Sequence, residues 1–184
     1  MKLKSVVILA IVVGFFLSVV LMGYSLFSSG PPYSAIILKG IELRNVKNDS
    51  VSKAKLVSSL DTLVALSNGE EIKTDWNRIV ECLSGSCSDD QYFDLIVSSA
   101  IEGQKDVMHS RLIADLVTAG RFWGSQDVVE FSKALASADE QLNSMRSKLL
   151  DKQWNAIVAC DGKCLEKNDL FFDLIRVVVS QKEE

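Results

Sequence analysis

This chain of 184 residues has little proline: there are two prolines, and none follows Pro32. Because a proline inside a helix breaks or kinks it, the stretch beyond Pro32 is free of that obstacle to long helices. From Val51 onward apolar residues recur every three or four positions, for example at Val128, Phe131 and Leu135. That spacing is typical of helices with one buried face and predicts an all-α fold.

Histidine is rarer still, because His109 is the only one. The sequence contains no glycine-centred serine motif and no glycine-rich phosphate loop, which argues against a hydrolase triad and a nucleotide site. His109 lies beside the apolar stripe of a predicted helix, where a partly buried or surface side chain is expected. We therefore predict no catalytic residue, no metal site, no cofactor and no enzymatic activity.

A basic stripe is also missing. All 24 acidic residues follow residue 41, whereas 18 of the 20 basic residues lie after Pro31, so the chain from Pro31 to Glu184 carries a net charge of −6. Nucleic acid is bound through clustered Lys and Arg side chains, and anionic lipid head groups attract the same residues. The charge therefore argues against nucleic acid as a partner and against close contact with anionic lipid.

One long apolar run is present, from Ser5 to Phe27, where 23 residues carry no charge. As a helix this run would be about 35 Å long, enough to cross a hydrocarbon core of about 30 Å. The alternative is a cleaved signal peptide, but its apolar region usually has only about 7–15 residues before a small-residue cleavage site. Residues 5–27 are therefore predicted to be a retained transmembrane anchor.

Basic residues near this run set its predicted orientation. Lys2 and Lys4 precede it, whereas the first charge after it is Lys39. Because positively charged flanks stay in the cytosol, residues 1–4 are predicted to be a cytosolic tail. The rest of the chain is then extracytoplasmic, in the periplasm or the extracellular space. Four cysteines agree with that location, since disulfides persist in oxidising compartments.

Residues 28–50 are predicted to be a spacer followed by a short irregular segment. The two adjacent prolines, Pro31 and Pro32, stiffen the spacer and lift the domain off the bilayer. The apolar residues 35–38 are compatible with a short strand or with an apolar plug that packs against the helices.

Two stretches of the chain repeat each other: WNRIVECLSGSCSDDQYFDLI from Trp76 and WNAIVACDGKCLEKNDLFFDLI from Trp154. The tryptophans match at an offset of 78 residues, and Phe93 matches Phe172 at an offset of 79. The offset changes only around the cysteines, where a loop tolerates insertions. This regularity predicts an internal duplication, with these four aromatic residues as the structural anchors of the two copies.

Each copy is predicted to contain a helix, a tryptophan-led helix, a cysteine-containing turn and a further helix. Unit 1 covers residues 51–120, and unit 2 covers residues 121–184. Two copies are too few for an open solenoid, so they are expected to pack face to face around one core. The predicted architecture is a transmembrane helix followed by one compact helical-bundle domain, 51–184, made of two disulfide-stapled helical hairpins.

The four cysteines are predicted to pair as Cys82–Cys87 and Cys160–Cys164, the most local of three possible connectivities. A catalytic redox pair is the alternative, but disulfide oxidoreductases usually carry Cys-x-x-Cys at the start of a helix. A zinc site made of all four cysteines is also disfavoured. Zinc ribbons favour a spacing of two, and an oxidising compartment removes the thiols.

Glycines and aspartates are expected to shape the helix ends. Gly85 and Gly162 lie between the paired cysteines and are predicted to take the left-handed conformation that ends a helix. Asp90 and Asp169 are predicted N-caps of the helices that follow. Gly120 is the predicted end of the helix that precedes it.

Asp94 and Asp173 each follow a phenylalanine in the repeated FDLI motif. Twin carboxylates are able to bind a cation or to serve in acid–base chemistry. The alternative is that each is a first-turn acid stabilised by the helix dipole. Trp76 and Trp154 are expected in the core, with their indole N–H groups hydrogen-bonded nearby.

Arg121, Phe122 and Trp123 are the candidate partner-binding residues. They lie in a predicted loop between Gly120 and Gly124. An Arg beside two aromatic residues resembles a binding hot spot in composition. The alternative is that the aromatic pair folds back over the junction between the two units.

These patterns predict a non-enzymatic, single-pass membrane protein whose exported domain binds another envelope or secreted protein. Two alternatives stay open. One is an inhibitor or immunity protein that acts against an exported toxin. The other is a thiol–disulfide exchange protein that uses Cys160 and Cys164.

Overall fold

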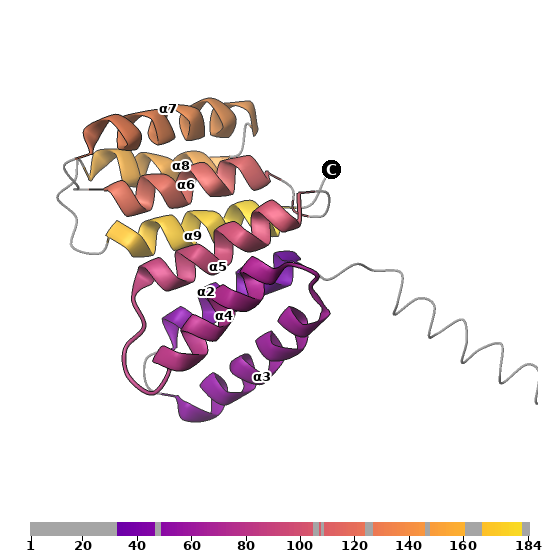
Figure 1. Ribbon diagram of the computed structural model, residues 1–184. Coiled ribbons are helices and arrows are strands. Elements are labelled where there is room, and N and C mark those ends of the chain that lie inside the picture. The colour runs from indigo at the N-terminus through magenta and orange to yellow at the C-terminus, as the bar shows by residue number, and fades with distance from the viewer. Residues whose placement is uncertain are drawn as a thin grey trace, which may run out of the picture. The chain divides into compact units, whose positions relative to one another are not determined.

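The computed structural model describes residues 33–46, 49–104, 107, 109–123, 127–145, 148–160 and 167–181. These residues form eight helices and no strand, which confirms the predicted all-α fold (Figure 1). In chain order the helices are α2 (Tyr33–Asn45), α3 (Ser50–Leu66), α4 (Glu70–Cys82), α5 (Asp89–Glu102), α6 (Ser110–Phe122), α7 (Val128–Met145), α8 (Lys148–Ala159) and α9 (Lys167–Ser180).

The predicted cytosolic tail and transmembrane anchor, residues 1–4 and 5–27, lie outside the described residues. Among the helices that the structure describes, none combines the length and apolar character needed to cross a membrane. All of these helices belong to one compact unit, Pro31–Glu184.

Helix α2 corrects the prediction of a short irregular segment in residues 28–50. Its 13 residues place Ile36, Ile37 and Ile41 fully in the core. Neighbouring β-branched residues suggested a strand, but packing on α3, α5 and α9 decides the conformation. The alternative of an apolar plug therefore describes how α2 packs, although the segment is a regular helix.

The helices form two sets of four with the same order of contacts. In the first unit (α2–α5), each helix packs on the next and α2 also packs on α5; in the second unit (α6–α9), the same holds, with α6 on α9. The units meet through α2 with α9 and through α5 with α6. These four helices form the middle of the molecule, and α3 and α7 lie on opposite outer sides (Figure 1).

The boundary between the units was predicted at residue 120, but these contacts put it earlier in the chain, between α5 and α6. Helix α6 is the counterpart of α2, since each begins its unit and packs on the last helix of that unit. Little in the sequence reveals this relationship. Ile36 matches Ile113 and Arg44 matches Arg121 at an offset of 77. The other buried positions of the two helices carry different residues.

The central helices run between two ends of the molecule. The Tyr33 pole contains Tyr33, residues 67–69 and residues 102–103. A Cβ added at Gly103 would lie 2.6 Å from Cβ of Tyr33, and one added at Gly69 would lie 2.9 Å from Cγ of Glu102, so these segments are in contact.

The bend pole is the opposite end, where α2 ends at Arg44–Asn45, residues 83–88 form the bend between α4 and α5, and α5 begins at Asp89. Lys53 Nζ donates a hydrogen bond to the carbonyl oxygen of Leu83 at 3.0 Å, which places the start of α3 at this pole as well. The end of α6, the start of α7, the end of α8 and the start of α9 also lie on this side of the molecule (Figure 1).

Several predicted helix ends are wrong. Helix α4 ends at Cys82 with Leu83 as its right-handed C-cap, and Gly85 does not adopt the left-handed conformation. Helix α6 continues through Gly120 to Phe122. Gly120 is needed for packing instead, because an added Cβ would lie 3.0 Å from Cζ of Phe93. Gly162 lies outside the described residues.

The starts of α5, α6 and α9 also differ from the prediction. Ser88 is the N-cap of α5 and forms a capping box with Gln91, which leaves Asp90 inside the first turn. Asp169 likewise lies in the first turn of α9. His109 is the N-cap of α6 in a left-handed conformation (φ 61°), so it precedes the apolar stripe of that helix.

Candidate functional site

A pocket of about 640 Å³ lies at the bend pole, where the first unit meets the start of α9. Its lining is mostly polar and combines two cations with three carboxylates. The lining residues are Leu43, Arg44, Asn45, Val46, Lys53, Leu83, Gly85, Cys87, Asp89, Tyr92, Asp169 and Asp173.

Arg44, at the end of α2, organises this pocket. Its Nε lies 2.8 Å from Oδ1 of Asp89 and its Nη2 lies 3.1 Å from Oδ2, so the guanidinium grips that carboxylate with two hydrogen bonds. Its Nη1 donates to Asp169, which belongs to α9. A single side chain therefore joins the last helices of both units.

Electrostatics at this ion pair favour the charged state of both Arg44 and Asp89. Burial acts to raise the pKa of Asp89, but hydrogen bonds from Arg44 and Asn168 outweigh it and leave the pKa below its usual value. Burial acts to lower the pKa of Arg44, but the hydrogen bonds to Asp89 and Asp169 outweigh it and raise the pKa of the guanidinium above its usual value. The guanidinium carbon also lies 4.5 Å from the ring centroid of Phe172, a cation–π contact.

Below this ion pair, two of the predicted repeat anchors stack on each other. The ring centroids of Phe93 in α5 and Phe172 in α9 are 4.4 Å apart and their planes differ by 4°. Both rings are buried. The site is thus supported from beneath by aromatic packing between the units.

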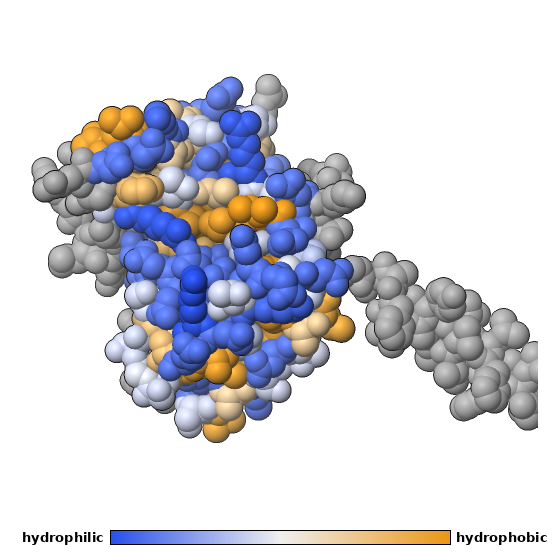
Figure 2. All heavy atoms as spheres, in the orientation of Figure 1, coloured by the Kyte–Doolittle hydropathy of each residue, from blue (hydrophilic) through white to orange (hydrophobic). Residues whose placement is uncertain are grey.

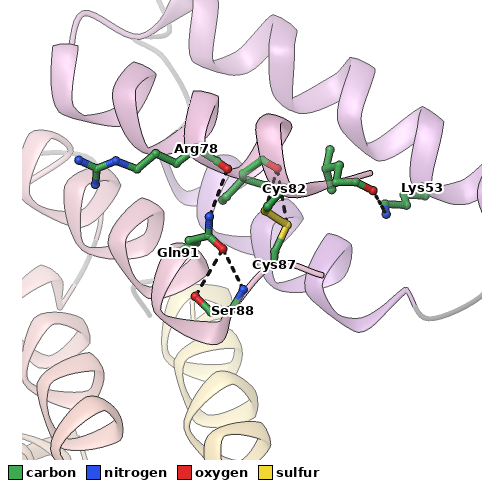
Figure 3. The surroundings of a disulfide bond; sticks show 8 residues. Lys53, Arg78, Cys82, Cys87, Ser88 and Gln91 are labelled. Carbon is green, nitrogen blue, oxygen red and sulfur yellow. Dashed lines mark hydrogen bonds between the residues drawn. A yellow bond between two sulfur atoms is a disulfide. The ribbon is translucent and has the colours of Figure 1, made fainter. Parts of the chain in front are cut away.

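The wall of the pocket includes the bend that the cysteines close (Figure 3). Cys82 and Cys87 form a disulfide, with their Cα atoms 5.1 Å apart, which confirms the predicted pairing in the first unit. Gln91 holds the bend from the other side, since its Oε1 accepts from the backbone N of Ser88 at 2.8 Å and its Nε2 donates to the carbonyl oxygen of Arg78 at 3.2 Å. Cys160 is disulfide-bonded too, while its predicted partner, Cys164, lies outside the described residues.

The repeated tryptophans are buried and make the same hydrogen bond in each unit. Nε1 of Trp76 donates to Oδ1 of Asp61 at 2.6 Å, and Nε1 of Trp154 donates to Oδ1 of Asp139 at 2.7 Å. The sequence analysis missed both aspartates. The signal was present, because each precedes its tryptophan by 15 residues and the two match at an offset of 78.

The candidate binding segment is not an exposed loop. Arg121 and Phe122 end α6, and Trp123 is only 3% exposed. The indole of Trp123 makes edge contacts with Phe131 and Phe171, at centroid distances of 5.2 and 5.5 Å. The ring of Trp123 is therefore enclosed in the folded domain and is not presented on its surface. It packs at the junction between α6, α7 and α9, which lies inside the second unit and not between the two units as the alternative expected.

Arg121 is used inside the domain as well. It pairs with the carboxylate of Asp94 in α5, which links the two units a second time. Arg44 and Arg121, matched in sequence, thus each bridge from the end of one helix to the other unit.

Asp94 and Asp173 do not meet as twin carboxylates. Asp173 lines the 640 Å³ pocket and pairs with Arg176 at 2.6 Å. Asp94 lines a separate pocket of about 310 Å³ on α4 and α5, beside Asp75. Neither lies in the first turn of its helix, so the helix-dipole reading is wrong too.

Within the residues that the structure describes, no group of three His, Cys, Asp or Glu side chains is placed to hold a metal ion. In the pocket at the bend pole, Asp169 and Asp173 pair with Arg44 and Arg176, and both carboxylates remain more than two-fifths exposed. Their exposed oxygens are able to accept a further hydrogen bond from a cationic side chain. No protein-family model, no curated protein and no solved structure matches this chain.

Proposed function

We propose that this chain is a single-pass, membrane-anchored protein whose extracytoplasmic helical domain binds another envelope or secreted protein at the bend pole, without catalysis. The uncharged run from Ser5 to Phe27 and the preceding Lys2 and Lys4 support the anchor and its orientation. The disulfide between Cys82 and Cys87 supports an oxidising compartment.

The observation that carries the proposal is a set of exposed valines at equivalent positions of the two units. Val51 and Val129 start α3 and α7, match at an offset of 78, and are each 62% exposed. Val80 and Val158, near the ends of α4 and α8, match at the same offset and are exposed too. Apolar side chains indeed reach the surface where α7 begins (Figure 2).

All four valines lie on the bend pole, because the helix ends that carry them are there (Figure 1). Burial of such side chains by a partner is favourable at roughly 25 cal/mol per Å² of apolar surface. We infer that the two units arose by duplication of a four-helix segment, so that the partner meets two similar apolar surfaces. The acidic pocket between them, at Asp169 and Asp173, would receive a Lys or Arg side chain of that partner.

An inhibitor or immunity protein would use the same surface against an exported toxin. Thiol–disulfide exchange, predicted for Cys160 and Cys164, is the weaker alternative. In the corresponding bend of the first unit, Asp89 and Asp90 lie two and three positions after Cys87, and carboxylates near a thiol would raise its pKa and oppose the thiolate that exchange requires. Both sulfur-bearing residues of this bend are also partly buried.

Photo-crosslinking in intact cells tests the proposal. A photoreactive residue is placed at Val51 in one variant of the full chain and at Val129 in another, and adducts are identified by mass. We expect both positions to yield the same partner protein, because that partner spans the bend pole.

The matched control is Leu66, which is 61% exposed and ends the same helix that Val51 begins. It should give no protein adduct. In a second control, Val129→Lys should suppress the adduct formed from Val51. Different partners from the two valines, or equal capture at Leu66, would contradict the proposed docking surface. A reporter at the C-terminus that is active only in the cytosol would contradict the proposed topology.

A further inference from the structure

The Tyr33 pole has its own exposed apolar side chains. Leu66, the last residue of α3, is 61% exposed, and Ile101, in the last turn of α5, is exposed as well. The contacts Gly69 to Glu102 and Gly103 to Tyr33 place both helix ends beside the start of α2. In Figure 2 apolar surface is visible where α3 ends.

The chain outside the described helices limits what can cover this pole. Only residues 28–32 separate Phe27, the end of the proposed membrane span, from Tyr33. Fully extended, the connection between these two residues reaches about 20 Å at roughly 3.3–3.6 Å per residue. The head-group layer on one side of a bilayer is itself about 5–8 Å thick, so a connection of this length would keep Tyr33 close to the lipid surface.

The bend pole cannot reach the same surface in that orientation. Helix α3 has 17 residues, so its two ends are about 25 Å apart at roughly 1.5 Å per residue. Leu66 therefore lies at the Tyr33 pole, and Val51 lies one helix length away from it at the bend pole.

The charges at the Tyr33 pole determine which lipid head groups this surface is able to contact. Glu70 and Lys73 neutralise each other at 2.8 Å. Glu71 and Glu102 add negative charge nearby, and Gly69 lies against the Glu102 side chain. Anionic head groups would be repelled, whereas zwitterionic head groups carry both signs and accept such a surface.

We propose that the Tyr33 pole rests on the membrane, with Leu66 and Ile101 among zwitterionic lipid head groups, so that the bend pole faces away from the bilayer. This proposal rests on the membrane anchor proposed above. It gives the domain a fixed orientation in which the partner-binding surface is presented outward. The lipid contact also supplies the cover that these two side chains lack in the domain itself.

Quenching of tryptophan fluorescence by brominated lipid tests the orientation. The full chain is reconstituted in phosphatidylcholine vesicles whose acyl chains carry bromine close to the head group. Leu66→Trp and Val51→Trp are compared, because the two positions share one helix and nearly equal exposure. The native tryptophans, Trp76, Trp123 and Trp154, are buried, and their signal is subtracted with the unsubstituted chain.

We expect the fluorescence added by Leu66→Trp to be quenched several-fold more strongly than that added by Val51→Trp. Ile101→Trp should behave like Leu66→Trp, which keeps the test valid if one variant folds poorly. Admixture of anionic phosphatidylglycerol should weaken the quenching.

Two results would overturn the proposal, and they are distinguishable. A chain that floats with the vesicles but shows equal quenching at both positions, or none at either, refutes the orientation and leaves the anchor intact. A chain that does not float with the vesicles refutes the anchor and the orientation together.

Discussion

Phe93 and Phe172 occupy matched positions of the two repeated stretches, and their rings lie face to face with centroids 4.4 Å apart. Contact between equivalent residues is typical of an isologous, two-fold arrangement. The other contacts between the units follow the same two-fold relation. The first helix of each unit packs on the last helix of the other unit, α2 on α9 and α6 on α5. The stacked pair therefore marks the centre of the interface on which both units depend.

Truncation of this pair should destabilise the whole domain. Phe93→Ala removes a fully buried ring, and we expect the free energy of unfolding to fall by about 3–5 kcal/mol. Phe172→Ala should cost a similar amount. Denaturant titration of both variants and of the double variant should reveal a coupling of about 0.5–1.5 kcal/mol from ring stacking. Costs that simply add would argue against the stacked contact.

Arg44→Met should remove the ionic bridge between Asp89 and Asp169 while it preserves the apolar stem. We expect a loss of about 1–2 kcal/mol at pH 7, because water partly screens Asp169. The folded domain lowers the pKa of Asp89, so this stabilisation is present above the usual value of 3.8 and is lost as the pH falls through the lower folded value. The difference between the variant and the parent chain should therefore shrink in acid. A difference that is constant with pH would exclude the ionic contribution.

Asp75 should show the opposite dependence on pH. Burial raises its pKa above the usual 3.8, despite a hydrogen bond with Ser98 and a nearby Arg78. The charged form therefore costs stability at neutral pH, and this cost disappears as the pH falls from the raised folded value to 3.8. We expect Asp75→Asn to raise the melting temperature at pH 7 and to have little effect near pH 3. An equal shift at both pH values would contradict the assignment to ionisation.

Asp61→Ala and Asp139→Ala form a matched pair that tests the repeated hydrogen bond. Each variant leaves the indole N–H of a buried tryptophan without its acceptor, so each should cost about 1–3 kcal/mol. Asp61→Asn and Asp139→Asn retain an acceptor oxygen and should recover most of that stability. If the alanine variants melt like the parent chain, the bonds contribute nothing.

Trp123→Ala separates a core role from a binding role. Because the ring is buried against Phe131 and Phe171, we expect a loss of about 3–5 kcal/mol in the free energy of unfolding. Phe122→Ala, on the neighbouring half-buried position, should cost much less. A Trp123→Ala chain that keeps its melting temperature would return the indole to the list of candidate partner contacts.

Local patterns explain which predictions succeeded. The helical spacing of apolar residues and the scarcity of proline act within one helix, and they predicted an all-α fold that the structure confirms. The pairing of Cys82 with Cys87 was also predictable, since two cysteines only five positions apart can meet without help from the rest of the fold. Trp76 and Trp154 were recognisable as equivalent positions because the residues around them are repeated.

Several helix ends and the burial of Trp123 differ from the prediction because tertiary contacts decide them. Gly120 looked like a helix terminator, yet α6 continues to Phe122, and the ring of Phe93 packs so closely on Gly120 that an added Cβ would lie 3.0 Å from it. The segment after it looked like a loop with a hot-spot composition, yet α7 and α9 enclose its indole. Composition alone does not distinguish an aromatic side chain that binds a partner from one that fills a junction.

The helical class, the local closure of the first bend and the repetition around the tryptophans were all predictable, because each depends on residues that are near one another in the chain. Helix packing in three dimensions was needed to reveal that α2 begins a unit, that Arg44 bridges Asp89 to Asp169, and that two sets of exposed side chains lie at opposite poles. Those relationships join residues separated by as many as 125 positions. They depend on how helices pack, and no periodicity along the chain encodes that packing directly.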